Sequence, residues 1–347
     1  MSRWVVRMWP PICADMGEVP VGVLTPFRST LESGVTLTHR LVAQVVRSEG
    51  SSLNPEATSA SSVPENPATR ASDRWHRTGL VGLSLVGGIA IFVGGTPYFE
   101  WTAMNDNPVY NALLVAVFGF SAWYLRRRDG MESYASCSQA LFVAAAAMLI
   151  LVIGPFNWLV TAEDESVVQA VQDKLAQFLC VVPVILILTW AARRPWGYIY
   201  LQKGHPQRWL TVGVSWLAAS AIVITLFALA SGIDSADLIA AAPWIVMFAA
   251  LNAFMEELWF RGVFLKPYSA AMGGKQAVVV TSAVFAAAHI GATYTASIAE
   301  HLVLLIAAAS IGVVGAWAMR WADALWLPLL LHMGLDLVVV FGLVESL

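Results

Sequence analysis

The sequence predicts an all-α fold: a polytopic transmembrane helical bundle of about nine transmembrane helices that follows a disordered N-terminal tail. The first observation is composition. Of the residues, 58% are hydrophobic and only 12% are charged, and the mean hydropathy is +0.67, values typical of polytopic membrane proteins. The second is a series of apolar segments of bilayer-spanning length, and the third is an alternation of basic and non-basic loops between them. Helices are expected because lipid cannot satisfy open backbone groups.

The first part of the chain differs from the rest. Residues 1–78 contain arginines and a run rich in Ser, Pro, Ala and Asn, SSLNPEATSASSVPENPATRAS. Such a composition buries too little apolar surface to offset the entropy of ordering, so we expect a disordered cytoplasmic tail. No apolar run near the start has the length of a signal-peptide core, and we do not expect a cleaved signal peptide.

Apolar segments then follow one another to the end of the chain. About 20 helical residues cross a hydrocarbon core of about 30 Å. Residues 79–194 are expected to hold the N-terminal transmembrane helices, and residues 195–347 the functional core. The predicted spans are 79–97, 108–125, 137–160, 175–192, 209–231, 238–265, 276–292, 302–319 and 324–344.

The loops between these spans predict an orientation. Lys and Arg gather in every second loop, whereas the loops between them are neutral or acidic. Because cytoplasmic loops carry an excess of Lys and Arg, we expect a cytoplasmic N-terminus and, after nine crossings, a C-terminus outside the cell membrane. The basic residues that carry this pattern are Arg70, Arg74 and Arg77; Arg126 to Arg128; Arg193, Arg194, Lys203 and Arg208; Lys266 and Lys275; and Arg320.

Charge and cysteine content exclude some partners. The net charge is -3 and no basic stripe interleaves with aromatic residues, so nucleic acid is not an expected partner. The three cysteines, Cys13, Cys137 and Cys180, are far apart and predict neither a disulfide framework nor a cysteine zinc site. The expected partners are the lipid bilayer and whatever binds within it.

Six ionisable residues lie inside the predicted spans, away from the helix ends. Each charged group at mid-membrane costs about 2.5–3.5 kcal/mol, so such a cluster indicates a function. Counted from Lys266, Lys275 and Arg320, which are expected on the same side, Glu256, His289 and His332 reach a similar depth, about 15, 21 and 18 Å along their helices, so one shared site is possible. The six residues are Glu256, Glu257 and Arg261 in the sixth span, His289 in the seventh, and His332 and Asp336 in the ninth.

Spacing assigns these residues to helix faces. Glu257 and Arg261 are four residues apart in the favourable order for an intrahelical ion pair, so we expect Arg261 to engage Glu257. Glu256 lies about 100° around the helix and stays available, with Asn252 one turn away as a possible contact. His332 and Asp336 are also four residues apart. Taken singly, each pair could equally serve packing.

The set of side chains favours hydrolysis by an activated water. A desolvated carboxylate beside a histidine is a suitable base, so Glu256 with His289 could deprotonate water. His332 could stabilise the oxyanion, and Asp336 could orient His332 through its other ring nitrogen. Zinc also accepts these ligands, and Glu256, His289, His332 and Asp336 are the candidates. The spacing matches no HExxH motif, so the metal and metal-free schemes both stay open.

Three motifs resemble those of a known family. EELWFR at 256–261 is similar to an EExxxR motif, FAAAH at 285–289 to an FxxxH motif, and HMGLD at 332–336 to an Hxxx(N/D) motif. Together, and in this order, they resemble the CPBP family of intramembrane proteases, also called Abi or CAAX-protease and bacteriocin-processing proteins. The resemblance covers roughly residues 195–347.

The resemblance implies an endopeptidase related to the type II CAAX prenyl proteases, which remove the last three residues from prenylated proteins. Carried over by position, it implies that Glu256 and His289 activate water and that His332 and Asp336 hold the oxyanion or a metal. Glu257 with Arg261 would support the site. Where the eukaryotic prenyl proteases have Asn, this chain has Asp336, and an ionised Asp cannot donate a hydrogen bond to an oxyanion. The implied substrate is a lipid-anchored or other membrane-tethered peptide.

Other functions were weighed against this one. The chain lacks the GxSxG, GxGD and HExxH patterns of serine, aspartyl and zinc intramembrane proteases. A proton- or ion-coupled transporter is an alternative because intramembrane Glu, His and Asp also mark ion pathways, but no internal repeat supports it. A non-proteolytic immunity or scaffold protein would carry the same motifs.

Overall fold

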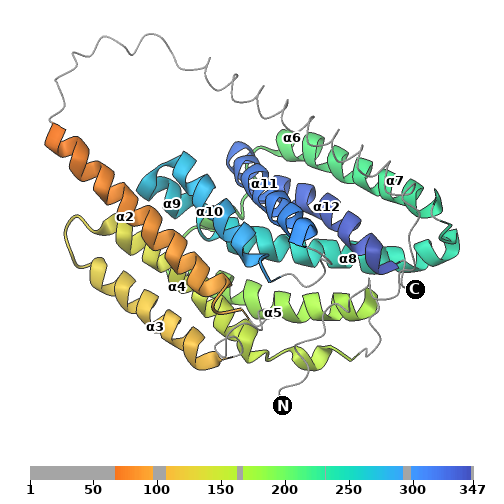
Figure 1. Cartoon of the computed structure of the whole chain (residues 1–347), viewed down its shortest axis with the longest axis horizontal. Helices are drawn as coiled ribbons and strands as arrows, with labels where there is room; N and C mark the ends of the chain where they lie inside the picture. The colour runs from red at the N-terminus through yellow and green to blue at the C-terminus, as the bar shows by residue number, and fades with distance from the viewer. Residues whose placement is uncertain (1–66, 97–106, 162–166, 231, 292–297, 345–347) are drawn as a thin grey trace, which may run out of the picture. The chain divides into compact units, whose positions relative to one another are not determined.

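The computed structural model describes residues 67–96, 107–161, 167–230, 232–291 and 298–344 (Figure 1). Within these ranges every element is helical and no strand occurs, which confirms the all-α prediction. Most of the predicted tail, residues 1–78, lies outside the described residues. The residues described from Trp75 onward belong to one compact unit, and the candidate site lies within it.

Three helices open this unit. They are α2 (Pro67–Phe92), α3 (Pro108–Leu125) and α4 (Glu132–Ile153). The start of α3 is fixed locally, because the Asn107 side chain accepts a hydrogen bond from the Val109 amide and Pro108 occupies the first turn. The α4 helix ends at Gly154, whose φ of 61° is the left-handed conformation that glycine adopts at little cost.

The helix α5 (Val167–Ala191) begins eight residues before its predicted span, 175–192. Its first two turns include polar residues that the hydropathy pattern had assigned to a loop. Lys174 therefore lies inside a membrane-spanning helix. The prediction that no span other than the sixth, seventh and ninth holds an ionisable residue is wrong at this position.

The middle of the chain forms two long, interrupted helices. The first consists of α6 (Pro206–Arg208), the π-helical segment η4 (Trp209–Val214) and α7 (Ser215–Ala230). The second consists of α8 (Ser235–Glu256), the π-helical segment η5 (Glu257–Gly262) and α9 (Leu265–Met272). Asp234 caps α8 by accepting from the Ala236 amide. Short 3₁₀ turns, η2 (Asn157–Leu159) and η3 (Trp196–Ile199), stand at either side of α5.

Three further helices complete the bundle: α10 (Gly274–Ala288), α11 (Ile298–Ala322) and α12 (Trp326–Val344). Over the described residues, 7 helical segments are long and apolar enough to cross a membrane, and α10 and the described part of α12 are shorter apolar helices. Each of the nine predicted spans thus has a helical counterpart. The chain is a multi-pass membrane protein.

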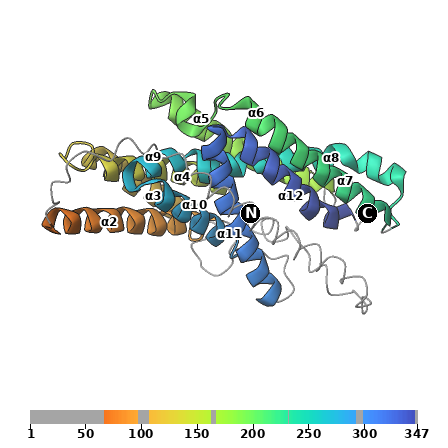
Figure 2. The same cartoon turned by 90° about the horizontal axis from the view of Figure 1, so that it is seen from above.

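Packing between helices brings the motif-bearing segments together. The helix α12 packs against α7, α8 and α11, while α5 packs against α4 and α8, and α10 packs against α9 and α11. Figures 1 and 2 show α8 and α12 running side by side with α5 next to α8. A small apolar cluster that includes Val171, Phe248 and Leu337 fixes α5, α8 and α12 to one another. The motifs of α8, η5 and α12 therefore face one another.

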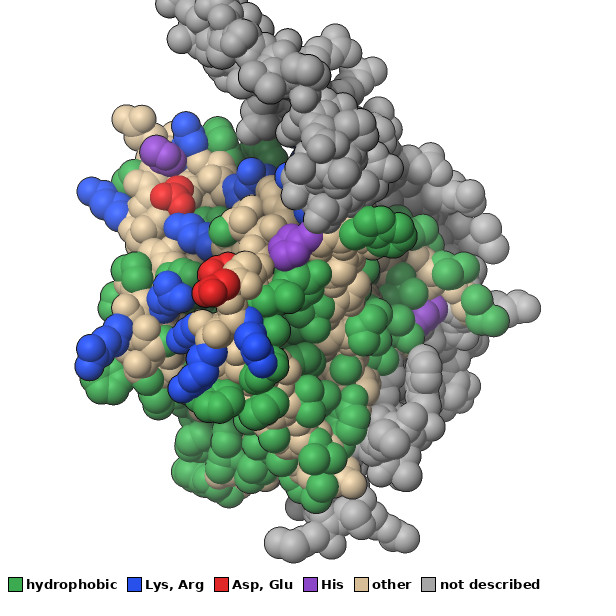
Figure 3. Space-filling model, turned by 90° about the vertical axis from the view of Figure 1, so that its left-hand side faces the viewer, with side chains coloured by type: hydrophobic (Ala, Val, Ile, Leu, Met, Phe, Trp, Pro, Cys, Tyr) green, Lys and Arg blue, Asp and Glu red, His purple; other side chains and the backbone are tan. Residues whose placement is uncertain are grey.

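Several predicted basic loops meet at one end of the bundle. The Lys266 ammonium donates to the Gly197 carbonyl at 2.7 Å, and the His205 amide donates to the Ala322 carbonyl at 2.8 Å. Lys and Arg side chains gather on one part of the face seen in Figure 3. This clustering is what the positive-inside pattern requires of loops on one side. Which side of the membrane that end faces stays a prediction.

Candidate active site

The site begins where α8 changes its helical winding. The Val263 amide donates to the Leu258 carbonyl at 3.0 Å, five residues back, which is the spacing of a π-helix. Every residue of η5 is buried. Single π turns inside α-helices are frequent at functional sites. Here the wider turn holds Glu257 and Arg261 inside the bundle directly after Glu256.

Glu257 and Arg261 form a buried ion pair within the site. Arg261 Nη1 donates to Glu257 Oε1 at 2.6 Å, and the two side chains are each 1% exposed. The Arg261 guanidinium also lies over the Phe285 ring, 4.3 Å from its centroid. Gly315 of α11 allows this close packing, because a Cβ there would lie 3.0 Å from Arg261 Nε. The predicted pairing of Glu257 with Arg261 is confirmed.

Glu257 has a second partner that the sequence did not predict. The same oxygen, Oε1, lies 2.9 Å from His332 Nδ1. A carboxylate oxygen paired with a ring nitrogen requires that nitrogen to carry the proton, which assigns the tautomer of His332 from its partner. Glu257 therefore joins Arg261 on its own helix to His332 on α12. It fixes the imidazole through Nδ1 and turns Nε2 toward the other side of the ring.

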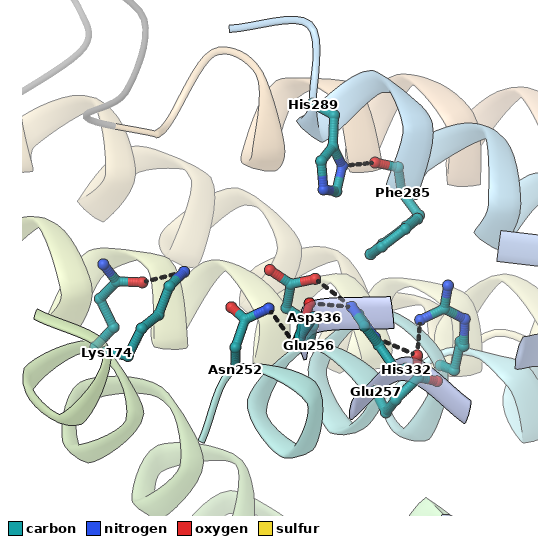
Figure 4. A network of polar contacts seen from close by, with 10 residues as sticks. Lys174, Asn252, Glu256, Glu257, Phe285, His289, His332 and Asp336 are labelled. Atoms are coloured by element: carbon teal, nitrogen blue, oxygen red, sulfur yellow. Dashed lines mark hydrogen bonds and ion pairs between the residues drawn. The ribbon is translucent and has the colours of Figure 1, made fainter. Parts of the chain in front are cut away.

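Two more carboxylates face Nε2 of His332 (Figure 4). Glu256 Oε2 lies 3.6 Å from Nε2 and Asp336 Oδ1 lies 3.5 Å from it. Glu256 keeps 16% of its side chain exposed, against 1% for Glu257 and 9% for Asp336. Glu256 is thus the carboxylate of this cluster that a substrate or a water molecule reaches most easily.

Asn252 and Asp336 form a connection that corrects one prediction. Asn252 was expected to contact Glu256, one turn away on α8. Its amide Nδ2 instead donates to Asp336 Oδ2 at 3.1 Å. The reason is that α12 packs directly on α8 and brings Asp336 within hydrogen-bond distance of Asn252. Asp336 was also expected to orient His332 through its other ring nitrogen, but Glu257 holds Nδ1 and Asp336 lies beside Nε2.

His289 lies on the opposite wall, at the end of α10. Its Nδ1 is 2.8 Å from the Phe285 carbonyl oxygen, which can only accept, so Nδ1 carries the proton and Nε2 of the neutral ring is an acceptor. Figure 4 shows the ring across from Glu256 and Asp336. Within the described part of the chain no hydrogen bond or ion pair joins His289 to Glu256, although they are close enough to interact electrostatically.

Five of the six sequence-predicted residues are thus connected by contacts, and His289 faces them across the site. The connected residues come from α8, η5 and α12, and Phe285 of α10 completes the wall: its ring meets that of His332 edge-on, with centroids 6.1 Å apart. Their roles in catalysis stay predictions.

The arrangement does not form a ready zinc site. Among the described residues no group of three or more His, Cys, Asp or Glu side chains is placed to hold a metal ion. The four candidate ligands do not converge, because His289 stands apart and Nε2 of His332 is paired with carboxylates. These residues as they stand do not fit the ion.

Sequence reasoning missed Lys174 as a residue near the site. Figure 4 shows it on α5, with Asn252 between it and Glu256. Its ammonium interacts electrostatically with Glu256, Asp336 and His289. The segment VVQAVQD continues the helix of the apolar run that follows it, and this could have placed Lys174 inside α5. Its polar residues lowered the local hydropathy, so the segment was predicted as a loop.

Comparison with known proteins supports the family resemblance. Residues 238–338 match the family model described as type II CAAX prenyl endopeptidase Rce1-like. This segment runs from α8 into α12 and contains all three motifs. No curated protein and no solved structure matches the chain. Residues 238–338 are therefore similar to the CPBP family, to which type II CAAX prenyl endopeptidases belong.

Proposed function

We propose that this protein is an intramembrane endopeptidase that hydrolyses a peptide bond near the membrane with a water molecule activated by Glu256 and His289. The observation that carries the proposal is the contrast among the carboxylates around His332. Glu257 is buried and contacts both Arg261 and His332 Nδ1, whereas Glu256 is partly exposed and lies 3.6 Å from Nε2 of the same imidazole. Glu257 can therefore hold His332 in position while Glu256 acts on the water molecule.

Glu256 would act as the general base. Water attacks the carbonyl carbon of the scissile peptide, its O–H bond breaks, and the proton passes to a Glu256 oxygen. Nε2 of neutral His289 is a free acceptor and can hold the second hydrogen of that water, since Nδ1 is bound to Phe285. The proton on Glu256 is then delivered to the leaving amine as the C–N bond breaks.

His332 would stabilise the tetrahedral oxyanion. Since Nδ1–H is directed at Glu257, a hydrogen bond to the oxyanion must come from Nε2–H, so His332 acts as an imidazolium. Glu257 on one side, with Glu256 and Asp336 on the other, favours that charged form. Asp336 in this scheme serves His332, which resolves how an Asp can replace Asn here without donating a hydrogen bond itself.

The substrate we propose is a lipid-anchored or other membrane-tethered peptide, with CAAX-type processing as the closest class. The family of the matched model acts on prenylated C-termini, and a site within the bilayer is reached from the membrane. We also propose that the N-terminus is cytoplasmic and the C-terminus is outside, from the loop charges. Residues 195–347, over which the family resemblance extends, would form the protease core.

Glu256→Gln tests the proposal directly. Cleavage of a fluorogenic, lipid-anchored peptide by the purified protein should fall by roughly 10²–10⁴-fold, because the general base is lost. Glu132→Gln, an exposed carboxylate at the start of α4, is the matched control and should keep full activity. Full cleavage by Glu256→Gln protein would show that the assigned base is wrong. Absence of cleavage by the unmodified protein in native-like lipid would contradict the function.

A further inference from the structure

Lys174 is a cation at the edge of the site that the hydrolytic scheme does not use. It lies two turns into α5, and its Nζ donates to Gln177 Oε1 at 3.3 Å. The ammonium also approaches the Phe248 ring of α8, 5.7 Å from its centroid. These two contacts hold the ammonium on the side of α5 that packs against α8.

Among the described residues, no carboxylate forms an ion pair with Lys174. Of the carboxylates in the described part of the chain, none lies within 4.0 Å of Nζ, and the ion pairs there involve Arg261, Lys266 and His332 instead. Its hydrogen-bond partner, Gln177, is neutral and buried. Asp173, Glu256 and Asp336 interact with the ammonium electrostatically without an ion-pair contact to it. A partly buried lysine whose hydrogen-bond partner is neutral is able to bind an anion from outside the chain.

Spacing along α8 gives the distance from this cation to the catalytic carboxylate. Phe248, Asn252 and Glu256 follow each other at intervals of four residues, so they share one side of the helix. At about 1.5 Å per residue, Phe248 and Glu256 are about 12 Å apart along the axis. An extended peptide covers about 3.3–3.6 Å per residue, so three or four residues span this distance. Figure 4 shows Lys174, Asn252 and Glu256 in that order.

We propose that Lys174 binds the free C-terminal carboxylate of the substrate and thereby places the scissile bond, three or four residues earlier, at Glu256. The assignment rests on the proposed function and adds to it a residue that sets specificity. It selects peptides that end close to the cleavage point over internal segments of a membrane protein. Lys174 is a binding residue for the carboxylate and takes no part in proton transfer.

A purely structural role for Lys174 makes a different prediction. Three carboxylates, Glu256, Glu257 and Asp336, surround His332, and Lys174 could do no more than balance their charge. In that case its removal would affect every substrate alike. A carboxylate-binding role affects only substrates with a free C-terminal acid, so paired acid and amide peptides separate the two.

The experiment measures binding to the cleavage-deficient Glu256→Gln protein in lipid nanodiscs. The probes are a fluorescent farnesylated heptapeptide with a free C-terminal carboxylate and the same peptide with a C-terminal amide. The acid should bind more tightly than the amide, and adding Lys174→Gln should weaken binding of the acid by roughly 10- to 100-fold while leaving the amide unchanged. Lys174→Arg should keep the preference. Lys203→Gln, at an exposed loop lysine, is the matched control.

The outcomes separate this inference from the proposed function. Equal binding of acid and amide, a preference that survives Lys174→Gln, or no binding of either peptide would overturn the assignment of Lys174. Equal loss of both peptides on Lys174→Gln would also overturn it and indicate charge balance or a lipid phosphate as the natural partner. A failure of the proposed function appears elsewhere, as absence of cleavage by the Glu256-containing protein while the acid preference persists.

Discussion

The buried pair of Glu257 and Arg261 supports a quantitative prediction. Arg261→Met keeps most of the side-chain volume but removes the guanidinium, leaving Glu257 in a site where it is fully buried. Breaking a buried pair in this way costs about 3–5 kcal/mol. We take about 3 kcal/mol, because His332 still donates to Glu257 Oε1, and add about 1 kcal/mol for the lost cation–π contact with Phe285.

The expected total loss is about 4 kcal/mol. With an unfolding entropy of about 2.1 cal/mol/K per residue over 347 residues, this corresponds to a fall in Tm of roughly 5–6 °C. Thermal unfolding in lipid nanodiscs measures it. Arg77→Met, at an exposed arginine of α2, is the matched control and should change stability by less than about 0.5 kcal/mol.

A double-mutant cycle tests the reason for the loss. In Glu257→Gln/Arg261→Met no uncompensated charge remains, so the double variant should recover about half or more of the stability lost in Arg261→Met. The reasoning is refuted if Arg261→Met is as stable as Arg77→Met, or if the losses of the two single variants simply add. Additive losses would mean that the two side chains do not depend on each other.

Three other changes test neighbouring parts of the site. Gly315→Ala should lower stability by about 1–3 kcal/mol, because its Cβ would crowd Arg261; unchanged unfolding would show that α11 yields freely there. Asn252→Leu should cost about 1–3 kcal/mol by removing the donor to Asp336, with Asn252→Gln as the control that keeps an amide; a neutral effect of the leucine variant would contradict the importance of that bond. Under the metal-free scheme, cleavage should persist after exhaustive chelation. Loss of activity that Zn²⁺ restores would instead assign a metal to the site.

Motif spacing predicted much of this site for a simple reason. Residues four apart share a helix face, and this placed Glu257 against Arg261 as the structure has it. The same rule suggested that Glu256 and Glu257, being adjacent, serve different partners. Both in fact approach His332, because an imidazole has nitrogens on two sides and can lie between neighbouring carboxylates. Helical geometry fixes the directions of side chains but not what another helix inserts between them.

Two other features were beyond reach of the sequence. Lys174 was assigned to a loop because Asp173 and the nearby glutamines depress hydropathy, and only packing of α5 on α8 shows that this polar stretch continues the helix. For His289, depth along the helix predicts a level similar to that of Glu256, and the structure places its ring across from Glu256 and Asp336. Whether it contacts Glu256 depends on the separation of α10 from α8, which no periodicity encodes.

A single oxygen atom, Glu257 Oε1, receives both the Arg261 guanidinium and the His332 imidazole. Protein engineers often gain robustness by exchanging a sealed ion pair for hydrophobic residues. In this chain that exchange would also release the imidazole proposed to stabilise the oxyanion. Stability and the proposed activity therefore depend on the same atom, and a more stable variant of the protein must be sought in other parts of the bundle.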